Sequence, residues 1–348
     1  WLAELEHLDS MKFQFPSIEM RLQVLSAHLR AIVIYCPSSA LRLPLVELLE
    51  AEIKNNSDVN RRVSAALALV THSSVCGPLN RAQWVLELVE KLAMSPDLAP
   101  VFRVYIGQVC GFWYWFNGNF GPALLTYERT AEWADKLNLK VRHFIALYII
   151  GSIHIATGRD SEGEVIAQTL QNLSRPKNPF QAGILTYFRL FVALKGQNKQ
   201  AAIEEIEHSK ILDELGSPFY SCGRRIHAAI AYATFGMFCE ARRSLSELRE
   251  IVSVHYPLHE SYFHFTRAFV AIREQNVLET RDALERGFET AKLVGGPGGV
   301  GWMLGGTTDV LAAALKLEIG TATARDWIRR MQLTCPDLNL PQWPWPIK

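Results

Sequence analysis

The sequence predicts an all-α protein: an α-solenoid superhelix of about eight helix-turn-helix pairs, with a period of about 40 residues. Two observations lead to this prediction. Strand signals are nearly absent, because no alternating apolar and polar run is bounded by turn residues, and no Asn-Gly or Asp-Gly turn joins two such runs. In addition, similar segments align on one glycine each, at Gly77, Gly118, Gly158, Gly196 and Gly236.

A small residue follows each of these glycines, always five positions further on. These small residues are Ala82, Ala123, Gly163, Ala201 and Ala241. A glycine allows the left-handed backbone conformation that ends a helix, and a small side chain lets the next helix pack closely against the first. Each segment is therefore predicted to be a pair of helices joined by a tight turn.

The predicted helices have one apolar and one charged face. In the third unit, the apolar residues of the second helix recur at helical spacing, at Ala123, Leu124, Tyr127, Ala131 and Ala134, and Glu128, Glu132 and Lys136 lie on the other side. In the sixth unit, the corresponding apolar residues are Ala241, Leu245, Leu248 and Val252. The pattern extends to further pairs near 18–54, 257–294 and 300–334, so the solenoid is predicted to span residues 1–334.

Each unit resembles a tetratricopeptide repeat lengthened from about 34 to about 40 residues. The third unit carries most of the signature, at Gly111, Tyr114, Ala123 and Tyr127, and the sixth has Ala229, Tyr232, Ala241 and Leu245 at the same positions. The fifth unit departs from the signature, because Arg189 stands where a small residue is expected.

Composition narrows the function classes. The hydrophobic content of 49% and charged content of 20% are ordinary for a well-cored soluble protein and do not exclude an enzyme, whereas a net charge of +1 argues against a nucleic-acid binder. The longest apolar stretch, residues 144–158, is too short for a membrane span and contains His154. Six cysteines without any C-x-x-C pair favour reduced thiols in the cytoplasm.

Stretched repeats of this kind resemble the sensor solenoid of bacterial transcriptional activators, the maltose-regulon-activator-like, ATP-dependent LuxR-type regulators. The chain ends on "LPQWPWPIK", in which two Trp-Pro pairs predict a stiff, extended linker over residues 335–348. This ending resembles the lead-in to a winged-helix bacterial transcriptional activator domain. The resemblance implies an excised sensor fragment whose partners include other domains of the same regulator.

No catalytic, cofactor or metal motif is predicted. Gly296, Gly298 and Gly301 fit G-x-G-x-x-G formally, but a predicted helix precedes them where a dinucleotide site needs a strand. A flexible inter-helix loop is the favoured interpretation, and a loop that contacts an effector is the alternative. His259 and His264 are one residue too far apart for the zinc-protease motif, and are interpreted as surface or inter-helix histidines. The protein is accordingly predicted not to be an enzyme.

The aromatic run of residues 111–120 supplies the candidate ligand-binding site. If Gly118 marks a turn, the preceding helix directs one stripe into the groove of the solenoid, at Tyr105, Gln108, Phe112 and Trp115, and the next unit adds Tyr148 and Ser152. The alternative interpretation places these bulky residues in the core between repeats. Arg224 and Arg225 begin a first helix, where they either face solvent or meet an anionic ligand in the groove.

Two functions are compatible with these sequence features. The first is a sensor domain of a cytoplasmic transcriptional regulator, which binds a small-molecule effector in the groove to control a separate DNA-binding domain. The alternative is a protein-interaction scaffold whose groove takes a peptide or a partner helix. A pocket closed by neighbouring units favours the sensor, and an open groove favours the scaffold.

Overall fold

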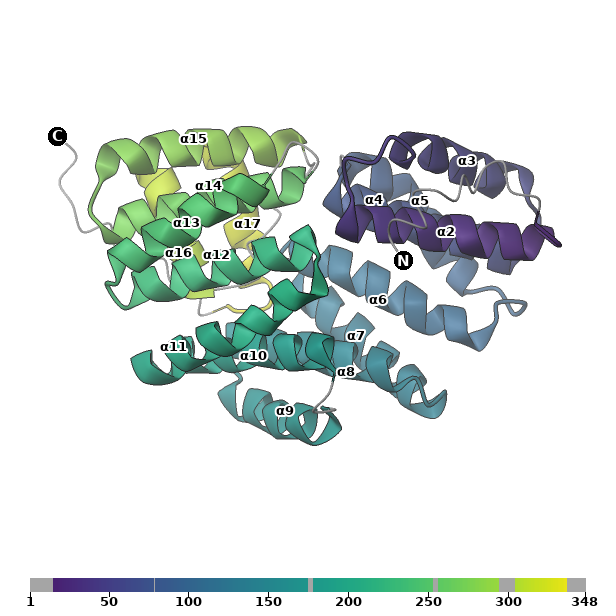
Figure 1. The fold of residues 1–348 in the computed structure, drawn as a ribbon, viewed down its shortest axis with the longest axis horizontal. Coiled ribbons are helices and arrows are strands. Elements are labelled where there is room, and N and C mark those ends of the chain that lie inside the picture. The colour runs from purple at the N-terminus through teal and green to yellow at the C-terminus, as the bar shows by residue number, and fades with distance from the viewer. Residues whose placement is uncertain (1–14, 78, 175–177, 253–255, 294–303, 337–348) are drawn as a thin grey trace.

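A computed structural model describes residues 15–77, 79–174, 178–252, 256–293 and 304–336. In these residues the chain forms sixteen α-helices and one 3-10 helix, with no strand (Figure 1). The helices are α2 (Ile18–Tyr35), α3 (Arg42–Asn55), α4 (Val59–Val75), α5 (Leu79–Ala93), α6 (Pro100–Phe116), α7 (Phe120–Lys136), α8 (Lys140–Ala156), α9 (Asp160–Leu173), α10 (Pro179–Lys195), α11 (Lys199–His208), η1 (Ser209–Leu215), α12 (Pro218–Thr234), α13 (Phe238–Ile251), α14 (Pro257–Arg273), α15 (Val277–Leu293), α16 (Leu304–Lys316) and α17 (Thr321–Gln332). The predicted all-α solenoid of eight helix pairs is confirmed.

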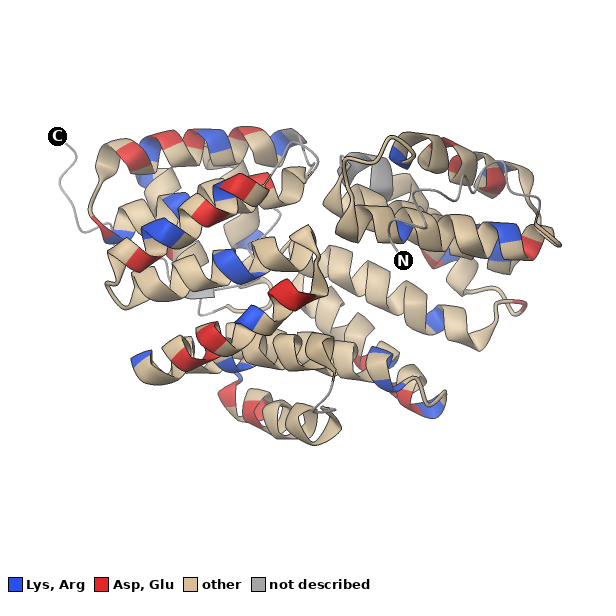
Figure 2. Ribbon diagram, in the orientation of Figure 1, with Lys and Arg blue, Asp and Glu red and all other residues tan. Residues whose placement is uncertain are grey.

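The helices form two layers. Each first helix, from α2 to α16, packs against the second helix of its own pair, and each second helix also contacts the first helix of the next pair. The first helices form the inner layer, since most residues of α12 and α14 are buried, whereas the second helix α13 buries one stripe. Charged residues are concentrated on outer helices such as α13 and α15, and α6 is almost free of them (Figure 2).

A residue with positive φ separates the two helices of most pairs. Gly118, Gly158 and Gly236 have φ of 71°, 77° and 71°, and the same conformation is taken by Gln197, Gln275 and Glu318 at 52°, 62° and 58°. The next residue then donates its backbone N–H across the turn, as Asn119 does to the carbonyl of Tyr114 at 2.9 Å. This six-to-one hydrogen bond recurs at Arg159, Asn198, Met237, Asn276 and Ile319. It satisfies a carbonyl that the helix end would otherwise leave without a partner.

The fifth unit corrects the predicted register by one residue. Gly196 has φ of −75°, and Gln197 is the left-handed residue instead. The closely packed small residue is therefore Ala202, which is fully buried, and not Ala201. The same shift removes Arg189 from the position at which the repeat needs a small residue. Its guanidinium lies 3.9 Å from the carboxylate of Glu205. Gly77 also lacks a positive φ, and the side chain of Ala82 lies outside the described residues.

Proline marks the start of several first helices. Pro100, Pro179, Pro218 and Pro257 each occupy the first turn of α6, α10, α12 and α14, where the missing N–H costs no hydrogen bond. Side-chain caps serve other starts: Asp58 accepts the N–H of Arg61, and Asn198 accepts that of Ala201, at 2.8 and 3.1 Å. Prolines and side-chain caps of this kind fix where these helices begin, whereas α8 begins without either.

Glycines permit close approach between helices inside the solenoid. A Cβ on Gly111 would lie 2.7 Å from the ring of Tyr127, and one on Gly151 would lie 2.6 Å from the ring of Phe188. Such distances are shorter than carbon atoms tolerate, so neither position accepts a larger residue without rearrangement. Gly111 thus has the inter-helix role that the repeat signature predicts.

The superhelix is tight enough that its early repeats meet its later ones. α2 contacts α12, and α4 contacts α14. The hydroxyl of Ser217 donates to the carbonyl of Ile34 at 2.9 Å, and the hydroxyl of Tyr256 lies 3.0 Å from the carbonyl of Val33 and 3.1 Å from that of Ile34. These carbonyls belong to the last turn of α2, whose C=O groups have no partner within the helix. The C-terminal end of α2 is therefore capped by residues about 200 positions away.

Some predicted segments fall outside the described residues. They include the glycine-rich stretch with Gly296, Gly298 and Gly301, and residues 337–348 of the predicted linker. Residues 300–303 of the last predicted pair lie outside as well.

The left-handed turns predict opposite effects for two substitutions. Gln275→Gly removes a strained left-handed residue at an exposed position and should raise the free energy of unfolding by up to about 1 kcal/mol. Gly236→Ala should lower it by about 1 kcal/mol, because φ of 71° disfavours a Cβ even where space is open. Urea unfolding of the two variants checks both signs. Unchanged unfolding midpoints in both would contradict the proposed role of these turns.

Candidate functional site

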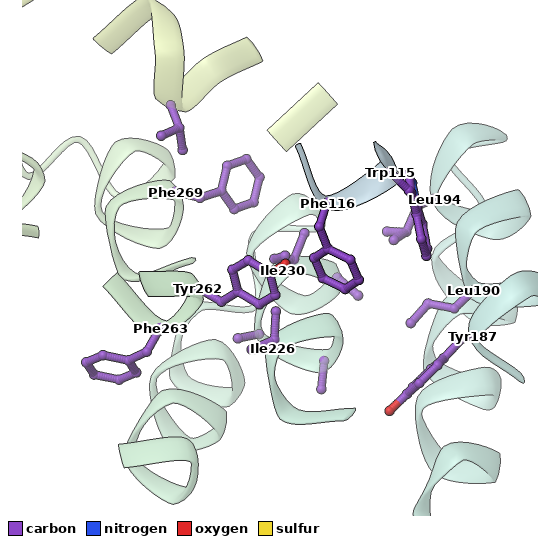
Figure 3. Packing of buried hydrophobic residues seen from close by; sticks show 14 of the residues in the cluster. Trp115, Phe116, Tyr187, Leu190, Leu194, Ile226, Ile230, Tyr262, Phe263 and Phe269 are labelled. Carbon is purple, nitrogen blue, oxygen red and sulfur yellow. The ribbon is translucent and has the colours of Figure 1, made fainter. Parts of the chain in front are cut away.

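The four predicted inward-facing residues of α6 differ in burial: Gln108 and Trp115 are buried, and Tyr105 and Phe112 are half-buried. Trp115 is only 1% exposed and meets the ring of Tyr148 edge-on, with 6.5 Å between centroids. Figure 3 shows Trp115 among the packed side chains of this core, together with Leu190 and Leu194 of α10. Trp115 is therefore part of the packing between repeats, which is the alternative that the sequence left open.

Tyr148 and Ser152 are likewise buried on α8. The Ser152 hydroxyl donates to the carbonyl of Tyr148 at 2.8 Å, so it is occupied within its own helix. The ring of Tyr148 also meets Phe188 edge-on at 6.4 Å. The structure thus brings Trp115 and Tyr148 together as predicted, but within the core.

Phe112 lies at the border of this core. It is half-buried, and its ring centroid is 4.0 Å from that of Phe116. Phe116 in turn stacks on Tyr262 of α14, with an interplanar angle of 8° and 6.0 Å between centroids (Figure 3). The stacked pair joins the third repeat directly to the seventh across the inside of the superhelix.

Arg224 and Arg225 both pair with one carboxylate. Asp213 of η1 lies 2.8 Å from Arg224 and 3.1 Å from Arg225, and it also accepts the hydroxyl of Ser221 at 2.8 Å. Burial alone would raise the pKa of Asp213, but the hydrogen bonds and the two guanidinium charges lower the pKa below its ordinary value. The two arginines therefore hold η1 against α12. Their predicted role toward a ligand stays a prediction.

Gln108 of α6 fixes the position of Arg142 of α8. Its amide NH₂ donates to the backbone carbonyl of Arg142 at 3.1 Å, and its carbonyl oxygen accepts from Nη1 of the same residue at 2.9 Å. The Arg142 guanidinium also lies over the ring of Tyr105, 4.6 Å from its centroid. Two of the residues predicted for the site, Tyr105 and Gln108, are thus brought together around an arginine that was not predicted.

The charge of Arg142 also acts on two residues of other repeats. Arg30 of α2 is half-buried, and burial followed by the charge of Arg142 lowers the pKa of its guanidinium. Burial and the neighbouring Tyr35 raise the pKa of the Tyr220 hydroxyl, on α12, to about 12, although Arg142 opposes this. We call Arg30, Tyr105, Gln108, Arg142 and Tyr220 the inner arginine cluster. All five residues belong to first helices, so the cluster lies on the inner layer.

Three members of the cluster, Arg30, Arg142 and Tyr220, were not predicted from the sequence. A signal for the two arginines exists, because each immediately precedes a strongly apolar stretch, "AIVIY" after Arg30 and "HFIALYII" after Arg142. A cation that borders an apolar run on an inner helix is a sequence signal for a polar position beside the core. The sequence could not predict that the charges of Arg30 and Arg142 interact, because this depends on the curvature that brings α2 near α12.

No metal or membrane site is found in the described part of the chain. The His, Cys, Asp and Glu residues there form no group that could hold a metal ion. His259 and His264, predicted to be surface or inter-helix residues, are both buried in α14. Among the described helices, none has the length and hydropathy needed to span a bilayer.

Comparison with known proteins shows the fold alone. No family model matches the chain, and no curated protein matches its sequence significantly. Among solved structures, the chain is similar to a Rap protein crystallised in complex with competence and sporulation factor. The TM-score is 0.58 and the identity 12%, over 90% of this chain and 97% of that chain. The chain therefore has the fold of an all-helical, tetratricopeptide-like solenoid.

Two buried histidines, His227 of α12 and His259 of α14, predict a loss of stability in acid. Burial lowers the pKa of His227 and of His259 to about 3, so both stay neutral in the folded chain. Below the ordinary histidine pKa of about 6.5, the unfolded chain binds protons that the folded chain does not. Each histidine then lowers the free energy of unfolding by about 1.4 kcal/mol per pH unit, down to about pH 3.

His259→Phe tests this contribution, because the ring packs edge-on against Phe219 at 4.9 Å and a phenyl group preserves that volume. Urea unfolding at about pH 7 and pH 5 should show a smaller loss of stability in the variant than in the wild-type chain. Because each chain is compared with itself at the two pH values, the cost of repacking the phenyl ring cancels. An equal loss in both chains would show that His259 takes no part in the acid response.

Proposed function

We propose that this chain is a protein-interaction scaffold that binds a segment of a partner, as a peptide or a helix, on its inner layer. The observation that carries the proposal is the inner arginine cluster, to which α2, α6, α8 and α12 each contribute. These helices belong to the first, third, fourth and sixth repeats, and the five side chains are polar or aromatic and half-buried or buried. Packing alone would be served better by aliphatic residues at these positions.

The composition of the cluster suits recognition. Tyrosine rings supply a large contact area at low cost in conformational entropy, and arginine supplies a rigid fork of donors. Phe180 extends the aromatic surface, because its ring meets that of Tyr220 edge-on at 5.7 Å. These residue types are the ones that dominate the binding energy of protein interfaces.

The structural comparison supports the same proposal. The similar Rap protein was crystallised with competence and sporulation factor bound to it, and this chain shares its fold over most of both lengths. Solenoids built from helix pairs commonly use their inner, concave surface for binding. The fold and the position of the cluster therefore agree.

Selection from a random peptide library displayed on phage tests the proposal. The wild-type chain is expected to enrich peptides, and Tyr105→Ala combined with Tyr220→Ala should weaken the selected peptides by about tenfold or more. Trp84→Ala is the matched control, since Trp84 is an exposed aromatic residue on the outer helix α5, and it should leave binding unchanged. Peptides that bind the inner double variant as well as the wild type would contradict the proposal, as would the absence of enrichment.

A second candidate is the small-molecule sensor of a cytoplasmic transcriptional regulator. The observation that favours it is the contact of the first repeat with the sixth and seventh, where Ser217 and Tyr256 cap the end of α2, since a closed superhelix suits a small ligand better than an open groove does. By resemblance, an effector bound there would control a separate DNA-binding domain through its differential affinity for two arrangements of the solenoid.

Thermal unfolding against sugars, amino acids, aromatic acids and nucleotides tests this candidate. A ligand present at 100 times its dissociation constant stabilises the folded chain by about 2.7 kcal/mol, which raises the melting temperature measurably. A rise with one class of compound would support the sensor. A panel without any rise would count against it and leave the scaffold as the better proposal.

A further inference from the structure

The starting observation is a contrast among four half-buried arginines on first helices. Arg103 donates to two backbone carbonyls, and Arg225 and Arg267 each pair with two carboxylates. Arg142 of α8 lies at a comparable depth, but its guanidinium donates only to the neutral amide of Gln108 and forms no ion pair with any residue that the structure describes. A half-buried positive charge without a counter-ion is costly, and a bound anion would remove that cost.

The guanidinium of Arg142 is held in one orientation. Gln108 accepts from its Nη1 at 2.9 Å and donates to the backbone carbonyl of Arg142 at 3.1 Å, and the ring of Tyr105 covers one face, with its centroid 4.6 Å away. Gln108 is itself buried, and its backbone carbonyl accepts the hydroxyl of Tyr127 at 3.1 Å. Within the described residues, the other N–H donors of Arg142 have no hydrogen-bond partner. A guanidinium that is already oriented loses less entropy on binding an anion than a free side chain does.

The charge around Arg142 also favours an anion. Lys140, Arg142 and His143 all stand in the first turn of α8, which contains no acidic residue. Asp135 lies 3.8 Å from His143, whereas Lys140 is exposed. The dipole of a helix disfavours cations at this end, so an anion held by Arg142 would offset an unfavourable arrangement of charge.

An apolar surface borders the guanidinium. The ring of Phe102 lies one turn before Tyr105 on α6, with 6.5 Å between the two centroids. Both residues are half-buried, so each keeps part of its surface for contact with a ligand. An apolar side chain next to the bound anion would pack against these rings.

We propose that Arg142 binds the carboxylate of an acidic side chain in the partner segment and is the residue that selects for it. This proposal rests on the proposed scaffold function and specifies the charge of its ligand. Carboxylates are the ordinary anions of a polypeptide, and their two oxygens match the parallel N–H groups that a guanidinium presents. The expected ligand is a segment in which Asp or Glu stands next to an apolar residue.

Peptide selection with the whole chain tests this site. Peptides that the wild type enriches should share Asp or Glu at one position. Replacing that Asp by Asn, or Glu by Gln, should weaken binding to the wild type by about tenfold and change binding to Arg142→Gln by less than about twofold. Arg129→Gln is the matched control, because Arg129 is exposed on the outer helix α7 and its loss changes the net charge equally, and it should keep the tenfold effect.

Gln108→Glu is a second variant, which keeps the test valid if Arg142→Gln does not fold. It places a carboxylate oxygen where the amide oxygen already accepts from Arg142, so it neutralises the guanidinium in place. The selected peptides should lose their dependence on the acidic residue in this variant too. A tenfold effect that persists in either variant would overturn the assignment to Arg142.

Melting temperatures in sodium propionate, sodium phosphate and sodium chloride at equal ionic strength separate this inference from the scaffold function. Propionate should raise the melting temperature of the wild type by about 1 °C over chloride, and Arg142→Gln should remove the rise. The absence of a rise would contradict the site, and a larger rise with phosphate that also depends on Arg142 would assign the site to phosphate instead.

The two experiments together distinguish failure of the site from failure of the scaffold. Selected peptides that need Tyr105 but no acidic residue would overturn the arginine site alone. A propionate rise without any selected peptide would overturn the scaffold function and leave a free carboxylate as the ligand of Arg142.

Discussion

The left-handed residue between the two helices of a pair is the constraint on which the rest of this structure depends. It fixes the six-to-one hydrogen bond that ends the first helix, and so sets the residues at which the second helix packs against it. Ala123, Gly163, Ala202 and Ala241 all stand five positions after such a residue, and all are buried. Because the geometry recurs in successive pairs, small rotations accumulate into a superhelix tight enough for α2 to reach α12.

That curvature explains why the inner layer combines a packed core with a polar site. Where inner helices meet across the axis, apolar rings fill the space, as with Phe116 and Tyr262. Where α6 meets α8, the side chains are glutamine, arginine and tyrosine instead, in Gln108, Arg142 and Tyr105.

The sequence predicted the fold well because its signals are local. Turn residues, helical periodicity and small residues each act within one repeat. The fifth unit was misaligned by one residue, since Gly196 stands beside the true left-handed residue, Gln197, and Gly77 of the second unit also lacks a positive φ. The site was predicted less well because it depends on contacts between distant repeats. Periodicity identified Tyr105 and Gln108 as inward-facing, but it could not separate them from Trp115, whose burial is decided by its contacts with neighbouring repeats.

The distance between the early and late repeats tests the central claim of closure most directly. Spin labels attached to Cys239 of α13 and to a cysteine replacing Glu47 of α3, both exposed, report this distance by electron–electron double resonance once Cys36 and Cys335 are replaced by serine. If the contacts of Ser217 and Tyr256 with α2 persist in solution, the free chain gives one narrow distance distribution. A broad distribution, or a second component at longer distance, would contradict the closed superhelix and the cluster that depends on it.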